Sequence, residues 1–247
     1  MSIDYDHQRN THTTTGAEAA LPVMLRTVPA SSLLDVGCGT GTWLRAVAAQ
    51  GITDFLGVDG VALDDRQLLI PSSQYQCHDL TKPLQLGRQF DLVLCLEVAE
   101  HLDPATAPCL VETLVNHSNQ VFFSAASPGQ PGQHHVNCQW PAYWQGLFNA
   151  RGYLCEDAIR WQLWDDSRVE PWYRQNLFLA RKDSKNAGQE PRLSPVIHPE
   201  MLPHFEAARA EIASKQHQSN LEEGHLPATW YARLTLRAWR QKLRRRQ

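Results

Sequence analysis

Several features are missing from this 247-residue sequence, and each absence excludes a class of protein. It has no run of about 18 consecutive apolar residues, which excludes a transmembrane helix. Residues 1–16 are polar and contain no apolar stretch, so we expect no secretory signal and a cytoplasmic protein. The six cysteines form no CxxC pair, so we expect small buried side chains rather than a disulfide framework or a zinc site.

Acidic residues are also missing from the end of the chain, where basic residues gather. Seven of the 23 Lys and Arg residues lie between residues 233 and 246, with no Asp or Glu among them. They are Arg233, Arg237, Arg240, Lys242, Arg244, Arg245 and Arg246. The rest of the chain therefore carries 16 basic residues against 26 acidic ones. A nucleic-acid-binding protein would have a broader basic face, so nucleic acid is not expected as the main partner.

The composition and the order of apolar segments predict an α/β protein. Apolar residues make up 43% of the chain and charged residues 20%, enough to bury a core. Short apolar strands alternate with helical segments, which indicates βαβ units and a mostly parallel sheet with helices on both faces. Strands are predicted at residues 32–36, 54–58, 74–78, 90–96, 120–124, 158–163 and 175–181, with an antiparallel edge at the end. Helices are predicted at residues 22–29, 42–50, 106–116, 140–151, 203–216 and 228–246.

The composition of the sequence changes after Lys182, which predicts a domain boundary there. We expect an α/β domain at residues 1–182 and a linker at residues 183–200, which are polar and rich in proline. Residues 201–247 are expected to form a basic, helical C-terminal extension, with Trp230, Leu234 and Trp239 near one helix face. For this helix three alternatives stay open: contact with a membrane surface, packing on the acidic body or on a second copy in a homodimer, and a solvated tail.

The most informative stretch reads Leu-Leu-Asp-Val-Gly-Cys-Gly-Thr-Gly-Thr-Trp. A buried strand leads into Gly37, Gly39 and Gly41 and then into a helix, as required where a backbone turns sharply against a ligand. Asp59 closes the next strand, where a carboxylate can accept from both ribose hydroxyls of an adenosine. Asp79 follows the third strand and can accept from an adenine amino group. These positions together predict a cofactor that contains adenosine.

Two details favour S-adenosylmethionine over a dinucleotide. A dinucleotide fingerprint places a small residue where this chain has Thr42. Asp35, two residues before the first glycine, would repel a pyrophosphate but suits a cationic ammonium group. The segments LLDVGCGTGTW, GVDG, HDL and FDLVLCLEVAEHL resemble, in order and spacing, the successive motifs of class I S-adenosylmethionine-dependent methyltransferases. The resemblance covers roughly residues 30–182.

This resemblance implies a Rossmann-like fold with a seven-stranded, mostly parallel sheet whose last strand is antiparallel. It implies an enzyme that uses S-adenosyl-L-methionine, with the glycine loop around the methionine end, Asp59 on the ribose, and Asp79 with Leu80 on the adenine. The cofactor contacts expected from it are Asp35, Gly37, Cys38, Gly39, Gly41, Thr42, Trp43, Asp59, Gly60, Asp79, Leu80, Leu96 and Glu97.

A narrower resemblance appears between residues 123 and 176. The segments His-His-Val-Asn and Gln-Trp-Pro-x-Tyr-Trp, followed by Trp-Tyr-x-Gln-Asn, resemble a bacterial methyltransferase subgroup. That subgroup is associated with gene clusters for surface glycans and natural products, and its acceptors are mostly unassigned. The resemblance therefore points to sites more than to a substrate.

Polar residues after the fourth and fifth strands are the candidates for chemistry beside the methyl group, because ligands lie beyond the carboxyl ends of parallel strands. Residues 124–137 form a glycine- and proline-rich loop with His134, His135 and Asn137. Histidine has an ordinary pKa suited to a general base at neutral pH. His135 is preferred because an extended segment would project it together with Asn137.

The run Glu97-Val-Ala-Glu100-His101 follows the fourth strand. It resembles the metal-bearing segment of methyltransferases that act on small-RNA 3′ ends or in ubiquinone biosynthesis, but the same letters occur in many methyltransferases without a metal. We expect no metal; if one is bound, the candidate ligands are Glu97, Glu100, His101 and His135. His101 is expected as a polar contact to the cofactor or the acceptor.

These observations predict a methyltransferase that acts on a hydroxyl of a small molecule or glycan, with a loop histidine as base. An N-methyltransferase for a natural-product amine and a metal-assisted RNA 2′-O-methyltransferase are the alternatives within enzymes. A catalytically silent binding module is the alternative outside them.

Overall fold

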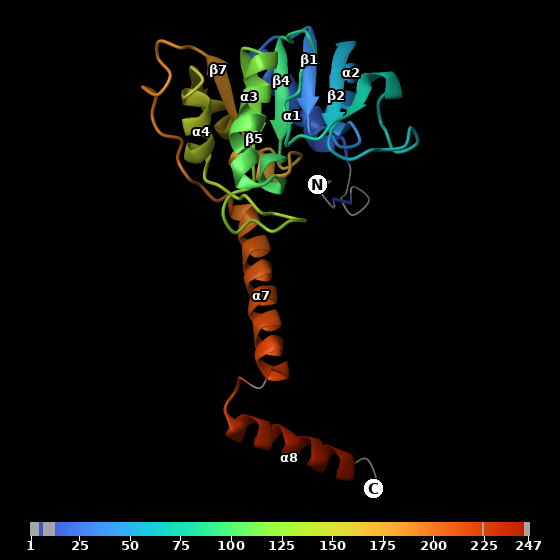
Figure 1. Ribbon diagram of the computed structural model, residues 1–247, viewed down its shortest axis with the longest axis vertical. Helices are drawn as coiled ribbons and strands as arrows, with labels where there is room; N and C mark the ends of the chain where they lie inside the picture. Colours follow the sequence, from blue (N-terminus) through green and yellow to red (C-terminus); the bar gives the residue numbers. More distant parts are fainter. Residues whose placement is uncertain (1–4, 7–12, 224, 245–247) are drawn as a thin grey trace. The chain divides into compact units, whose positions relative to one another are not determined.

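A computed structural model describes residues 5–6, 13–223 and 225–244 (Figure 1). Its centre is a seven-stranded sheet in the order β3-β2-β1-β4-β5-β7-β6. All neighbouring strands pair in parallel except β7, which is antiparallel to both β5 and β6. The strands are β1 (Ser32–Val36), β2 (Asp54–Asp59), β3 (Tyr75–Cys77), β4 (Leu92–Leu96), β5 (Gln120–Ser124), β6 (Tyr153–Glu156) and β7 (Phe178–Lys182). The predicted Rossmann-like sheet with one antiparallel strand is confirmed.

Helices connect these strands and cover the sheet. The α-helices of the sheet-containing unit are α1 (Thr15–Thr27), α2 (Thr42–Ala49), α3 (Ala107–His117), α4 (Pro141–Asn149), α5 (Ala158–Leu163) and α6 (Pro171–Asn176). Short 3₁₀ helices are η2 (Ser72–Gln74), η3 (Ala99–His101), η4 (Pro104–Thr106) and η5 (Pro199–Met201).

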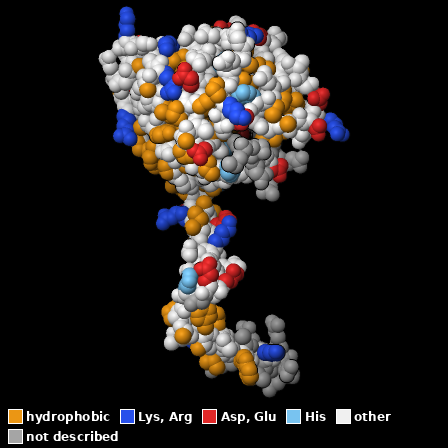
Figure 2. Space-filling view, in the orientation of Figure 1, with side chains coloured by type: hydrophobic (Ala, Val, Ile, Leu, Met, Phe, Trp, Pro, Cys, Tyr) orange, Lys and Arg blue, Asp and Glu red, His pale blue; other side chains and the backbone are white. Residues whose placement is uncertain are grey.

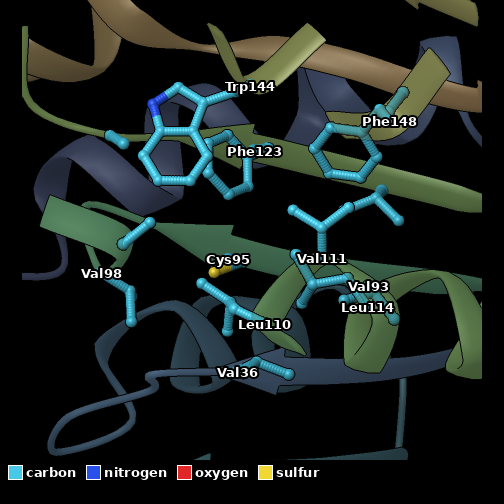
Figure 3. Packing of buried hydrophobic residues seen from close by; sticks show 14 of the residues in the cluster. Val36, Val93, Cys95, Val98, Leu110, Val111, Leu114, Phe123, Trp144 and Phe148 are labelled. Carbon is cyan, nitrogen blue, oxygen red and sulfur yellow. The ribbon is translucent and has the colours of Figure 1, made fainter. Parts of the chain in front are cut away.

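The two faces of the sheet are packed by different helices because successive strand residues point to opposite sides. In β4, Val93 and Cys95 face α3 and α4, in the cluster that also contains Phe123 and Trp144 (Figure 3). The alternate β4 residues belong to the second cluster, which packs against α1, α2 and α5. The central strands are therefore buried on both faces, as expected for a sheet covered by helices on both sides.

Three predicted elements differ from the structure. The segment 158–163, predicted as a strand, is helix α5, because its buried residues Ile159 and Leu163 have helical spacing. The segment 175–181 begins inside α6, whose first residue is Pro171, a favourable position for proline. The helix predicted at 22–29 is α1, which starts earlier and contains Pro22.

Residues 183–201, called the strap below, pack along the sheet-containing unit although a linker was expected there. Leu193 is buried and its backbone N–H donates to Gln145 at 2.8 Å. The Glu190 carboxylate accepts from Gln145 and from the Cys155 backbone N–H at 3.0 and 3.1 Å. These contacts lower the pKa of Glu190 to about 2 despite partial desolvation. The strap is therefore part of the compact unit Met1–Leu202.

The second unit, Pro203–Gln247, consists of helices. These are α7 (Leu202–Glu222), which begins at the border between the units, and α8 (Ala228–Arg244). The predicted C-terminal helical extension is present, while Arg245 and Arg246 of the predicted helix lie outside the described residues. No helix within the described part of the chain is long and apolar enough to cross a membrane.

The cysteines are all free, without a disulfide among the six. Cys38, Cys95 and Cys155 are buried as expected. Cys77 is exposed instead, because it lies in β3, at the edge of the sheet.

Candidate active site

The strand order places a crevice between β1 and β4. From these two neighbouring strands the chain continues in opposite directions, to β2 on one side and to β5 on the other. Ligands of doubly wound sheets bind at such a switch point, beyond the carboxyl ends of the strands. A pocket lies at this place. It is lined by Tyr5, Gly37, Asp59, Gly60, Val61, Leu80, Glu97, Val98, His101 and Leu102.

The loop after β1 requires glycine at its first position. Gly37 has a φ of +83°, which L-residues rarely adopt, and a Cβ built there would lie 2.3 Å from Cγ2 of Val98. Gly41, with a φ of +87°, caps α2 and would place a Cβ 2.9 Å from Ile70. At both positions a side chain would strain the backbone and collide with a neighbouring side chain of the protein.

Asp59 ends β2, and its carboxylate connects the glycine loop after β1 with the loop after β2. One of its carboxylate oxygens accepts from the Gly39 N–H at 2.8 Å, and the other accepts from the Val61 N–H at 2.9 Å. The side chain lines the pocket while it fixes the glycine loop.

Asp35 lies in β1 behind the glycine loop, with 2% of its surface exposed. Its Oδ2 atom is buried and has no hydrogen-bond partner in the described structure. Burial, and then the charge of Asp59, raise the pKa of Asp35 to about 8. A cationic group of a ligand would give this buried carboxyl group the partner that it lacks and would stabilise its charged form.

The other predicted cofactor residues divide between the pocket wall and the layer behind it. Gly60, Leu80 and Glu97 line the pocket. Asp79 is not among the lining residues, because Thr81 and Lys82 engage its carboxylate and lower its pKa to about 2. The layer behind the wall contains Cys38, Gly39, Thr42, Trp43 and Leu96; of these, Trp43 donates to the hydroxyl of Tyr173 at 3.3 Å.

Glu97 follows β4 in a backbone conformation that is unusual for a residue with a side chain, with a φ of +55°. Its carboxylate accepts from the amide of Gln130 at 2.8 Å and from the amide of Asn176 at 3.2 Å. Burial raises the pKa of Glu97, and these two amides lower it. The amides thus hold an acidic side chain at the pocket wall.

Glu100 lies behind Glu97, and 1% of its surface is exposed. Its Oε2 atom has no hydrogen-bond partner among the described residues. Burial and the charge of Glu97 raise the pKa of Glu100 well above its ordinary value. Like charges in one buried site favour a protonated form.

Two histidines meet beside these acids, with their ring centroids 5.0 Å apart. His101 lines the pocket, and the ring of Tyr5 contacts it at 4.7 Å. The Nδ1 atom of His135 lies 2.9 Å from the Gln130 carbonyl oxygen, so Nδ1 carries the proton and Nε2 carries the lone pair. Burial lowers the pKa of His101 to about 4 and also lowers that of His135, so both rings are neutral at pH 7.

The other two predicted catalytic residues lie away from the pocket. His134 is exposed, in a positive-φ conformation. Asn137 is 1% exposed, and its amide contacts the Ala99 carbonyl and the Gln139 side chain, which ties the loop to η3. His135 and Asn137 both turn inward, as predicted, but Asn137 has no surface that an acceptor can reach.

Glu100, His101 and His135 offer one ligand atom each, all within 4.8 Å of one another. The His101 Nδ1 atom, like Glu100 Oε2, is buried without a partner in the described structure. This cluster could hold either a proton or a divalent cation.

Some pocket residues have no signal in the sequence. Tyr5 lies in the polar N-terminal stretch, and Gln130 and Asn176 are far from Glu97 along the chain. Val98, in contrast, could have been expected near the glycine loop, because it directly follows the predicted residue Glu97.

Comparison with known families decides the class of protein. A family model described as "Methyltransferase domain" matches residues 5–167, about two thirds of the chain. The chain belongs to this methyltransferase family. The prediction of a methyltransferase is therefore confirmed at the level of the family.

Curated relatives share part of this methyltransferase domain. A ubiquinone biosynthesis O-methyltransferase of Pseudomonas syringae pv. tomato is 32% identical over 105 residues, which cover 37% of this chain and 43% of the relative. The corresponding protein of Acinetobacter baylyi is 36% identical over 101 residues, covering 37% of this chain and 42% of the relative. The chain thus spans less than half the length of the curated relatives that it matches.

Solved structures confirm the fold. The sugar N-methyltransferase KedS8 from a Streptoalloteichus species has a TM-score of 0.52 at 20% identity, covering 68% of this chain and 87% of that one. The amino pentose methyltransferase CalS10 from Micromonospora echinaspora, solved with S-adenosylmethionine bound, has a TM-score of 0.52 at 18% identity, covering 69% and 92%.

Proposed function

We propose that this methyltransferase uses S-adenosylmethionine to methylate a hydroxyl group of a small-molecule or glycan acceptor, with a histidine as base. The most direct support is a pair of neutral imidazoles, of which His101 lines the pocket and His135 contacts His101 from behind. The loop carbonyl of Gln130 fixes the proton on Nδ1 of His135 and leaves Nε2 free to accept one. A base oriented in this way by a second group is a recurring device of catalytic sites.

The cofactor side fits S-adenosylmethionine. Gly37 lines the pocket without a side chain, and Asp59 also lines the pocket. The buried, unpartnered oxygen of Asp35 would be matched by an ammonium group. When bound, S-adenosylmethionine supplies an electrophilic methyl carbon attached to a sulfonium.

The acceptor side holds the proton chemistry. With S-adenosylmethionine bound, Nε2 of His135 would accept the proton that the acceptor hydroxyl loses when its oxygen takes the methyl group. Glu100 and His135 each offer a ligand atom within 4.8 Å of the other, close enough for the carboxyl group to interact with the resulting imidazolium. His101 and Tyr5 cover the acceptor and limit the access of water. Proton transfer of this kind contributes roughly 10²–10⁴-fold to a rate.

The acceptor class rests on two further supports. The narrower resemblance around His-His-Val-Asn points to glycan and natural-product clusters. The relatives are named for ubiquinone biosynthesis, and the structural neighbours include sugar N-methyltransferases. The names of these relatives and structural neighbours refer to small molecules, which favours a small acceptor over RNA.

A screen with hydroxyl and amine acceptors, read by S-adenosylhomocysteine formation, tests the proposal. His135→Ala should reduce kcat roughly 10²–10⁴-fold on a hydroxyl acceptor. His134→Ala, a change of the exposed neighbour, should leave kcat within about twofold. If His135→Ala is as active as wild type, or if only amines accept the methyl group, the N-methyltransferase alternative replaces the proposal.

A metal-assisted reaction is the second candidate, supported by the cluster of Glu100, His101 and His135. Two of its ligand atoms are buried without partners, which a divalent cation would satisfy. Incubation with EDTA distinguishes the two candidates. Activity unchanged within about twofold supports the histidine base, whereas a loss that Mg²⁺ or Mn²⁺ restores supports the metal.

A further inference from the structure

Helix α8 has an apolar stripe that no described residue of its own unit covers. Ala232, Leu236 and Trp239 follow the spacing of one helix face, and Leu236 and Trp239 are 61% and 69% exposed. Trp230 and Leu234 were predicted on the same face as Trp239, but at 3.6 residues per turn they lie on the opposite side of the helix. Figure 2 shows hydrophobic side chains gathered along α8. A large exposed apolar surface of this kind marks a contact site.

The described contacts of α7 with α8 involve only the first turn of α8. The Tyr231 hydroxyl bonds to the carbonyl oxygens of Asn220 and Leu221 at 3.0 and 3.1 Å, and the Trp230 ring lies 5.8 Å from the ring of His217. No residue of α7 is buried within the described unit, and α7 has no apolar face to offer. The turns of α8 that follow Tyr231 are therefore available to a partner.

Charge identifies the partner. Arg233 and Arg237 are exposed along a stripe next to the apolar one, and the chain has no Asp or Glu after Glu223. Seven Lys and Arg residues fall between residues 233 and 246. Two copies of α8 packed face to face would bring these cations together, which disfavours self-association. A nucleic acid would satisfy the arginines but leave Leu236 and Trp239 exposed to water.

We propose that α8 is an interfacial helix that binds an anionic membrane surface, with its apolar stripe in the headgroup region and its arginines on lipid phosphates. Amphipathic helices with Trp and Leu on one face and Lys or Arg on the other bind in this way. Each basic residue near an anionic surface strengthens binding roughly fivefold. The proposal does not depend on the methyl-transfer chemistry.

Vesicle co-sedimentation of the full chain tests this directly. Wild type should bind vesicles of phosphatidylcholine with phosphatidylglycerol at low salt, and should bind pure phosphatidylcholine at least tenfold more weakly. Arg233→Gln with Arg237→Gln should weaken binding to anionic vesicles roughly 25-fold. Leu236→Ser with Trp239→Ser should weaken it about tenfold or more.

The matched control removes the same charge from α7, which lacks an apolar face. Arg209→Gln with Lys215→Gln should change vesicle binding by less than about twofold. Circular dichroism should show equal helix content in all variants, so that lost binding is not lost folding.

Four results would overturn the proposal. The first is wild type that fails to bind anionic vesicles at low salt, and the second is a control variant that loses as much binding as the arginine variant. The third is RNA binding that survives Leu236→Ser with Trp239→Ser while vesicle binding is absent, because the partner would then be nucleic acid. The fourth is a dimer that these serine changes dissociate in the absence of vesicle binding, because the partner would then be a second copy.

Discussion

The pocket wall around β1 and β2 comes from two short stretches of the chain, whereas the wall around His101 is assembled from four distant ones. On the first side, Asp35, Gly37 and Asp59 lie at or next to the ends of two neighbouring strands. On the second side, residues near Tyr5, Glu97, His135 and Asn176 meet. The first side is determined locally, and the second depends on the whole fold.

This difference has a physical consequence. The first side is fixed by backbone: two N–H groups bond to Asp59, and two glycines adopt conformations that other residues avoid. The second side is fixed by side-chain amides and ring contacts. Buried atoms without a partner among the described residues occur on both sides, in Asp35 on the first and in Glu100 and His101 on the second. We expect changes on the first side to abolish cofactor binding, and changes on the second to affect turnover.

The largest effect is expected from Asp35, through pH. Its pKa in the folded chain is raised to about 8 from an ordinary value near 4, so folding disfavours the charged form. This loss of unfolding free energy is absent below about pH 4, where Asp35 is protonated in both the folded and the unfolded chain. It grows as the pH rises towards 8 and stays constant above that pH. Unfolding free energy of the cofactor-free chain should therefore fall by up to roughly 1.4 kcal/mol per pH unit in this window.

Urea unfolding at pH 5 and pH 8 measures this dependence. Glu97 and Glu100 also have raised pKa values and contribute in the same direction, so the comparison needs Asp35→Asn. That variant should lose about 2–4 kcal/mol less than wild type between the two pH values. Equal losses in both proteins would show that Asp35 is not the titrating group.

A smaller effect is expected from Gly37→Ala, which places a Cβ against Val98 in a left-handed conformation. Affinity for S-adenosylmethionine, measured by equilibrium dialysis, should fall roughly a hundredfold, about 3 kcal/mol. Gly51→Ala is the matched control, because Gly51 has a φ of +85° and open space around it. It should cost only the backbone strain of about 1–2 kcal/mol in stability and leave affinity unchanged.

The smallest effect is expected from Gln130→Ala on the second side. This change removes a hydrogen bond to the Glu97 carboxylate, and the unfolding free energy should fall by about 1–3 kcal/mol. Turnover should fall more than affinity for S-adenosylmethionine, because the change leaves the hydrogen bonds of Asp59 on the first side intact. Gln139→Ala on the same loop is the control; an equal loss of turnover there would mean that general loop stability, not Glu97, matters.

The same local–distant division explains what the sequence could predict. The first five strands and the glycine loop follow from period-2 and motif patterns close together in the chain. Strand β6 was missed, because the short apolar segment after it, which forms α5, fits either helix or strand. The strap looked like a linker because its few buried residues, among them Leu193 and His198, are isolated in a polar sequence. The roles of Gln130 and Asn176 could not be predicted, because their spacing from Glu97 is set by tertiary packing.

Calorimetric titration with S-adenosylmethionine tests the central claim most directly, namely that the crevice at the ends of β1, β2 and β4 is a cofactor site for methyl transfer. We expect saturable binding of about one molecule per chain, competition by S-adenosylhomocysteine, and no heat from NAD⁺, because Thr42 stands where a dinucleotide fingerprint has a small residue. Absence of heat with S-adenosylmethionine at high micromolar protein concentration, or saturable binding of NAD⁺ in its place, would contradict it.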